Sequence, residues 1–200
     1  AEGRHEMERQ ILYLVLMISL LMPLSAKDRK NDDIERMKKW QAFASPGSMH
    51  QKLAERAGKW KNRAKMWMKP GSPPVETRSS SETKMILGGR YLKMFYEGSV
   101  SNIPFKGISI AGYDNHKKKF FSIWIDTMGT GVLLSEGQYD ATGKILTEIG
   151  EMDDVATGQK LKMKIVTTML DRDSYKLEMY SHYPGRKPFK SMELISNRIK

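Results

Sequence analysis

The stretch GKWKNRAKMWM, from Gly58 to Met68, decides the fold. Basic residues fill every odd-numbered position from Lys59 to Lys65, and the even-numbered positions are uncharged. Because successive side chains of a β-strand point to opposite faces, this period of two predicts a strand with one charged face and one face toward a core. The predicted core row is Trp60, Asn62, Ala64, Met66 and Met68.

Strand patterns then continue to the end of the chain. We expect further strands at Val75 to Leu87, Arg90 to Val100, Phe105 to Tyr113, Lys118 to Met128, Gly131 to Tyr139, Lys144 to Glu151, Lys160 to Leu170, Ser174 to Tyr180 and Phe189 to Arg198. Most connections are short and rich in Gly, Asp and Asn, which is typical of hairpins and leaves no room for helical crossovers. The sequence therefore predicts a mainly β fold, an antiparallel up-and-down barrel of about ten strands. A two-sheet sandwich is the alternative.

Two helices are expected ahead of the strands. Asp32 and Asp33 can cap a short helix with apolar residues at helical spacing. Ser45 can cap a second helix, with Pro46 at its first position and Gly58 as its stop. The apolar stripe of the second helix would be Met49, Leu53 and Ala57. A helix with one apolar face must cover something, so we expect it to plug one end of the barrel.

A short apolar run from Ile11 to Met22 lies near the start of the sequence. It is too short for the roughly 20 residues of a membrane-spanning helix, and charged residues follow from Lys27, which is typical of a secretory signal peptide. We therefore expect export to the periplasm or medium, with cleavage near Ala26; an uncleaved membrane anchor is the alternative. The predicted organisation is a signal peptide with an upstream extension (1–26), a basic linker with a short helix (27–44) and one barrel domain (45–200).

Composition narrows the classes of function. Thirty-four Lys and Arg residues against 23 Asp and Glu residues give a net charge of +11, and there is no cysteine. Disulfides, thiolate metal sites and a cysteine nucleophile are therefore excluded. The basic excess is concentrated between Lys27 and Lys69, which could favour an anionic envelope surface. An exported protein rarely meets nucleic acid, so we expect no nucleic-acid partner.

An ordered series of motifs carries a family resemblance. The first is P-G-x-x-H-x-x-L-x-x-x-x-G-x-W, from Pro46 to Trp60. Later pieces are MILGGRY at 85–91, GYDN at 112–115, WIDTMGTG at 124–131, SEG at 135–137 and GEMDD at 150–154. The series resembles the bacterial domain-of-unknown-function family 1579. The resemblance implies a lipocalin-like, or calycin-type, barrel, and it brings no activity with it.

Motifs for catalysis, metals and cofactors are weak. Residues 107–111 read GISIA, one residue from a G-x-S-x-G nucleophile elbow, but the strand pattern continues on both sides. The histidines are isolated in sequence; His182 is the best placed to ligate haem, and nothing nearby supports that role. His50 is expected to form hydrogen bonds near the plug. We therefore predict no metal site, no cofactor and no identified catalytic residue.

The inward rows of the barrel carry the functional prediction. Methionine adapts to irregular apolar shapes, and aromatic rings add flat surfaces, so we expect a small, largely apolar ligand in the interior. The expected contact residues are Trp60, Met66, Met68, Tyr113, Trp124, Asp126, Met163, Tyr175 and Met179. Asp126 could equally hold the amides of its turn. A solidly filled barrel is the plain alternative.

Two other classes of function stay open. One is a hydrolase or isomerase that uses carboxylates such as Asp126 and Glu136 at the barrel mouth. The other is an envelope interaction module that uses the basic segment from Lys27 to Lys69. The oligomeric state does not follow from the sequence.

Overall fold

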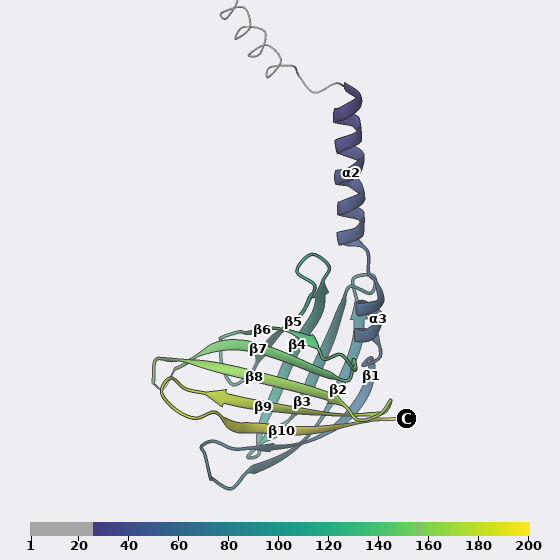
Figure 1. Cartoon of the computed structure of the whole chain (residues 1–200). Coiled ribbons are helices and arrows are strands. Elements are labelled where there is room, and N and C mark those ends of the chain that lie inside the picture. The colour runs from purple at the N-terminus through teal and green to yellow at the C-terminus, as the bar shows by residue number, and fades with distance from the viewer. Residues whose placement is uncertain (1–25, 156) are drawn as a thin grey trace, which may run out of the picture. The chain divides into compact units, whose positions relative to one another are not determined.

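The computed structural model describes residues 26–155 and 157–200 (Figure 1), which divide into two units at the junction between Phe43 and Ala44. The expected signal peptide up to residue 25 lies outside the described residues. Within the described part, no helix is long and apolar enough to cross a membrane.

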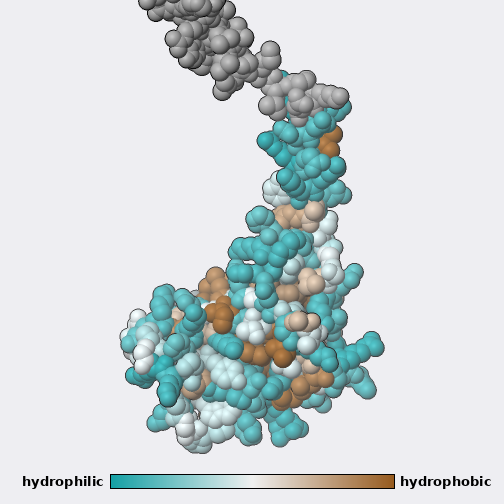
Figure 2. Space-filling view, in the orientation of Figure 1, coloured by the Kyte–Doolittle hydropathy of each residue, from teal (hydrophilic) through white to brown (hydrophobic). Residues whose placement is uncertain are grey.

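The first described helix is α2, Ala26–Ala44, and it is longer than the sequence pattern predicts. Asp32 and Asp33 lie inside this helix, so their predicted role as its cap is wrong. The residues before them, Lys-Asp-Arg-Lys after Ala26, are compatible with helix and extend it toward the N-terminus. The surface of α2 is mainly hydrophilic (Figure 2), although Met37 and Trp40 are exposed.

The second unit contains a closed barrel in which all ten strands are antiparallel. The strands are β1 (Gly58–Met66), β2 (Val75–Ile86), β3 (Tyr91–Val100), β4 (Ile103–Asp114), β5 (Lys119–Asp126), β6 (Leu133–Tyr139), β7 (Ile145–Asp154), β8 (Gln159–Met169), β9 (Ser174–His182) and β10 (Phe189–Arg198). Consecutive strands are neighbours, and β1 pairs with β10 to close the barrel. The predicted up-and-down barrel is confirmed.

Buried and exposed side chains alternate along most of β1 as the sequence predicts. Trp60, Asn62 and Ala64 are buried, and the basic residues between them are exposed. Lysine and arginine on the outer face remain hydrated, whereas the inner row loses contact with water. The predicted row is wrong at its end, because β1 stops at Met66 and Met68 is 78% exposed in the following loop.

The two ends of the barrel differ. At the end next to α3 (Ser48–Ala54), which we call the closed end, β1 begins and β10 finishes. Three separate buried clusters line the interior, and the one below α3 contains Leu53, Leu92, Phe120 and Leu146. At the opposite, open end, several inward-facing residues remain half-buried, including Phe105, Trp124 and Asp126. One end of the barrel is therefore sealed by apolar contacts, and the other is accessible.

Helix α3 and the segment after it cover the closed end with two of the three residues predicted for the apolar stripe, and His50 takes the place of Met49. His50 and Leu53 are buried and Ala57 is half-buried, whereas Met49 is 39% exposed. The helix starts at Ser48, with extended Gly47 as its N-cap, so the predicted start at Ser45 and Pro46 is also wrong. The imidazole explains the later start, because the backbone N–H of Gly47 donates to Nδ1 of His50 at 3.0 Å and fixes the first turn.

We expect His50 to make stability depend on pH. Burial lowers the pKa of His50 below its usual 6.5, outweighing the hydrogen bond to the backbone of Tyr113, which raises it. Below pH 6.5 the unfolded chain binds more protons than the folded chain, because the pKa of His50 is lower in the folded protein. The contribution of His50 to stability is therefore fully present above pH 6.5, and it is lost as the pH falls toward the lower pKa of the folded protein. Urea unfolding of wild type between pH 8 and pH 5 should show this loss.

The matched comparison uses His116, which lies exposed in the turn between β4 and β5. The loss below pH 6.5 should disappear in His50→Asn and persist in His116→Asn. An unchanged pH profile in His50→Asn would contradict the role assigned to His50.

Candidate functional site

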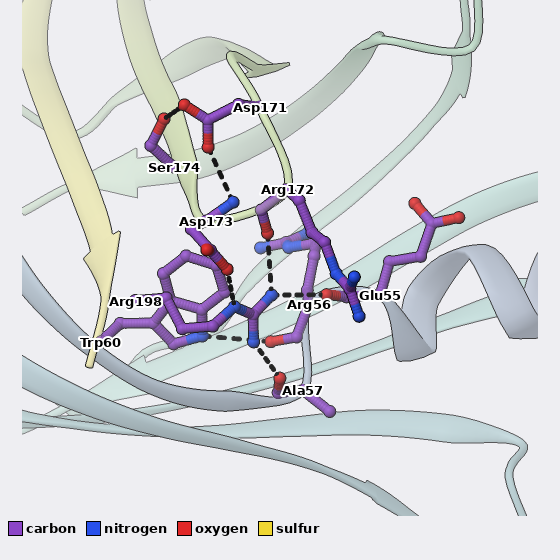
Figure 3. A network of polar contacts seen from close by, with 9 residues as sticks. All are labelled: Glu55, Arg56, Ala57, Trp60, Asp171, Arg172, Asp173, Ser174 and Arg198. Atoms are coloured by element: carbon purple, nitrogen blue, oxygen red, sulfur yellow. Dashed lines mark hydrogen bonds and ion pairs between the residues drawn. The ribbon is translucent and has the colours of Figure 1, made fainter. Parts of the chain in front are cut away.

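Arg198, the last residue of β10, fastens the closed end (Figure 3). Its Nε donates to Asp173 Oδ1 at 2.9 Å, and Nη2 donates to the carbonyl oxygens of Glu55 and Arg172 at 2.8 and 3.1 Å. Nη1 donates to the carbonyl oxygen of Ala57. One guanidinium thus joins β10, the segment after α3 and the turn between β8 and β9.

The Arg198 guanidinium lies over the face of Trp60, with its Cζ 4.2 Å from the centroid of the indole ring. The ring is 0% exposed, packs edge-on against Tyr175 at 5.0 Å, and donates through Nε1 to the carbonyl oxygen of Arg56 at 3.1 Å. Gly58 has φ +138°, and an added Cβ would lie 2.5 Å from Nη1 of Arg198. The absence of a side chain at Gly58 therefore leaves room for the guanidinium of Arg198. Helix α3 already ends at Ala54, so the predicted role of Gly58 as the helix stop is wrong.

Three of the predicted ligand contacts belong to this sealed region. Trp60 and Tyr175 form one buried cluster with Ala64 and Leu194. Tyr113 packs against Phe120 at 4.8 Å and against His50 at 6.0 Å, below α3. The faces of these rings are in contact with other protein side chains, so they stabilise the closed end of the barrel.

Three other predicted contacts come together nearer the open end. Met163 is buried in a cluster with Leu133, Leu161 and Ile165, and both Trp124 and Met179 pack against that cluster while remaining half-buried. Met66 is also half-buried and is aligned through Met192 of β10 with Met179 of β9. Of the four methionines predicted to contact a ligand, Met66, Met163 and Met179 therefore lie in one region and Met68 does not.

Sequence reasoning missed two members of an aromatic group on β3 to β5. The ring centroids of Tyr96, Phe105 and Trp124 lie 6.0 to 6.2 Å from one another. A Cβ at Gly107 would lie 2.5 Å from the Trp124 ring, so the glycine leaves room for the indole. The sequence alternation could have indicated both residues, because Tyr96 and Phe105 are on the inward-facing rows of β3 and β4.

Asp126 completes this group with two hydrogen bonds. Its Oδ2 accepts from Trp124 Nε1 at 2.6 Å, and its Oδ1 accepts from the backbone N–H of Met128 at 2.8 Å. The carboxylate therefore orients the indole and also holds the turn amide, as one of the two predicted roles requires. It remains half-buried at the open end.

Glu136 does not share a site with Asp126. It lies on the outer face of β6, opposite Phe121 of β5 and away from the open end, and forms ion pairs with Lys117 at 2.8 Å and Lys119 at 3.7 Å. The hydrogen bond and charge of Lys117 lower the pKa of Glu136. These two carboxylates do not provide the paired acid and base of a hydrolase.

Two surface grooves flank the barrel in the part of the chain that the structure describes. The larger, about 290 Å³, lies between β5 and β6 and is lined by outward-facing Phe121, Ile123 and Leu134 together with the Lys117–Glu136 ion pair. The other, about 170 Å³, is at the open end and includes Met68, Tyr183 and Phe189. Met68 therefore lies at the rim and not in the interior row.

The interior also carries buried polar side chains, of which the alternation in β1 predicted Asn62. Ser196 donates to Asn62 Oδ1 at 2.6 Å, and Asn62 donates to Ser81 at 3.3 Å, so this buried chain is satisfied internally. Glu148, 6% exposed, accepts from Ser135 at 3.1 Å. Buried polar side chains therefore lie among the apolar clusters of the interior.

Histidine and metal chemistry gain no support from this geometry. His182 and His116 are exposed, and His50 is occupied by its helix-capping hydrogen bond. Among the residues that the structure describes, no group of three or more His, Asp or Glu side chains is placed to hold a metal ion.

The comparisons with known proteins agree with this geometry. A family model described as "Protein of unknown function (DUF1579)" matches residues 45–198. The chain belongs to the DUF1579 family. No match was found among curated proteins. The crystal structure of Rv2717c from M. tuberculosis is similar, with a TM-score of 0.57 and 13% identity over 78% of this chain and 100% of that chain. At that identity the likeness shows the fold alone.

The residues that carried the DUF1579 resemblance mostly have structural tasks here. Gly47 and His50 cap α3, Leu53 seals the end, and Gly58 and Trp60 accommodate Arg198. The Trp124 and Asp126 pair differs, because it lies in the accessible half of the interior.

Proposed function

We propose that this DUF1579 protein binds a small, largely apolar molecule in the open half of the barrel interior. Met163 and Met179 would contact the apolar body of the ligand, and the rings of Tyr96, Phe105 and Trp124 would provide a flat surface. Asp126 would keep the indole in place at the entrance. The proposal concerns binding and includes no catalytic step.

One observation carries this proposal: the two walls of the interior differ in burial. Asn62, Met163, Thr167 and Ser196, on β1, β8 and β10, are buried, whereas most inward-facing residues of β3 to β5 are half-buried; Leu92, Gly107 and Phe120 are the buried exceptions. Six of these half-buried residues are Met94, Tyr96, Ser109, Ala111, Ser122 and Trp124. Side chains that point into a barrel and still reach solvent border unfilled space, and three of these six are small.

Titration with the neutral fluorescent probe N-phenyl-1-naphthylamine tests the proposal. We expect one saturable site whose affinity changes little with salt, because burial of apolar surface supplies the driving force. Met179→Lys should abolish binding, since it places a charge among the apolar contacts. Met128→Lys, the matched control in an exposed turn, should bind like wild type.

A second variant separates loss of binding from loss of folding. Trp124→Phe retains an aromatic ring and should fold, but it should strongly reduce energy transfer from protein to bound probe. Absence of saturable binding to folded wild type, or unchanged binding in folded Met179→Lys, would overturn the proposal.

We also propose that the protein acts outside the cytoplasm, as the apolar run before Ala26 suggests. N-terminal sequencing of protein from the native host should find a chain that begins at Lys27. A chain that still carries residues 11–22 would contradict cleavage and favour the anchored alternative. The basic segment from Lys27 to Lys69 remains a candidate surface for anionic envelope polymers, and binding through it would weaken steeply with salt.

A further inference from the structure

Two arginines meet at the closed end, and they differ in their hydrogen bonding (Figure 3). Arg198 donates to four acceptors. Arg56 is 9% exposed, yet its guanidinium has no hydrogen bond or ion pair within the described part of the chain, and its Nε is fully buried. Its contact is with the face of Tyr175, 5.2 Å from the ring centroid.

A second unsatisfied polar group lies close by in the fold. Thr83 points inward from β2, is 2% exposed, and its hydroxyl has no hydrogen-bond partner. The register places Thr83 opposite Gly58 of β1, two residues after Arg56. Buried donors normally find partners, because leaving one unpaired costs about 1 to 3 kcal/mol. Two such groups at one end of a barrel point to a missing polar ligand.

The charge around Arg56 favours an anion. Lys52 lies 5.7 Å from the ring centroid of Tyr139 and is ion-paired with Glu55 at 3.0 Å, whereas Arg56 has no ion pair among the described residues. Burial is the main reason that the pKa of Tyr139 is raised, so its hydroxyl stays protonated and can donate. Glu148 forms no ion pair with Arg56 and is held by Ser135. A planar guanidinium matches the two oxygens of a carboxylate.

We infer that the ligand of this barrel is an amphipathic carboxylate, with its head group on Arg56 and Thr83 and its apolar chain directed toward Trp124. The inference rests on the proposed binding function and adds the class of ligand. Tyr139 packs on Phe120 at 5.0 Å, and Trp124 is four residues further along β5, about 13 Å away. Ser109, Ala111 and Ser122, on the inward rows between Phe120 and Trp124, are small and half-buried. These dimensions suit a chain of medium length.

The test compares dodecanoate with dodecanol at pH 7.5, by displacement of the neutral naphthylamine probe. Wild type should bind dodecanoate about ten- to hundredfold more tightly than dodecanol. In Arg56→Gln, dodecanoate should fall to the affinity of dodecanol, and dodecanol should be unchanged. Arg63→Gln, on the exposed face of β1, is the matched control and should behave like wild type.

Thr83→Val provides a second variant, because it keeps the shape of a side chain whose hydroxyl has no protein partner. It should fold as stably as wild type and bind dodecanoate several-fold more weakly. Equal affinity of wild type for acid and alcohol, or dodecanoate binding unchanged in folded Arg56→Gln, would overturn the carboxylate assignment and leave the binding function standing. Failure of both compounds and of the probe to bind would overturn the binding function itself.

Discussion

Replacing Trp60 with alanine should lower the free energy of unfolding by about 3 to 5 kcal/mol. The ring is 0% exposed, packs on Tyr175 and supports the guanidinium of Arg198. Its removal leaves a cavity at the point where the first and last strands meet. Urea unfolding monitored by circular dichroism measures the change.

Trp40→Ala is the matched control, because Trp40 is 67% exposed on α2. It should change the free energy of unfolding of the barrel by less than about 0.5 kcal/mol. A loss below about 1 kcal/mol for Trp60→Ala would show that Trp60 does not support the closed end.

The second large effect is expected for Arg198→Met, which should cost about 3 kcal/mol of unfolding free energy. The substitution keeps most of the apolar stem and removes the donors to Asp173 and to three backbone carbonyl groups. The carbonyl groups of Glu55, Ala57 and Arg172 would lose a charged donor. Stability is again read from urea unfolding.

Arg63→Met removes an equal charge from the exposed face of β1 and should be nearly neutral. Equal stability losses in Arg63→Met and Arg198→Met would mean that net charge, and not the network at the closed end, determines the effect.

Local sequence rules were sufficient for the barrel. The alternation of charge in β1 and the short turns predicted each strand to within a few residues, and β10 matches its predicted bounds of Phe189 and Arg198. These signals are local, since they depend on the direction of successive side chains and on residues such as Gly88 and Gly89, both with positive φ in one hairpin. Helix starts were less predictable, because the imidazole of His50 displaced the usual serine cap.

The site was only partly predictable, because alternation tells which side chains point inward but not how deep they lie along the barrel. Trp60 and Trp124 both point inward, yet one is sealed beneath Arg198 and the other faces the accessible half. Arg198 reaches Ala57 across 141 residues of sequence, which no local pattern reveals. The single hint was an arginine on the otherwise uncharged row of Leu194 and Ser196.

Methionine-methyl NMR of the protein titrated with dodecanoate tests the binding site most directly. The account predicts saturable shifts for the methyl groups of Met66, Met163 and Met179 at a single stoichiometric site, and no shifts for the exposed Met37 and Met128. Absence of saturable shifts, or shifts confined to the exposed methionines, would contradict binding in the barrel interior.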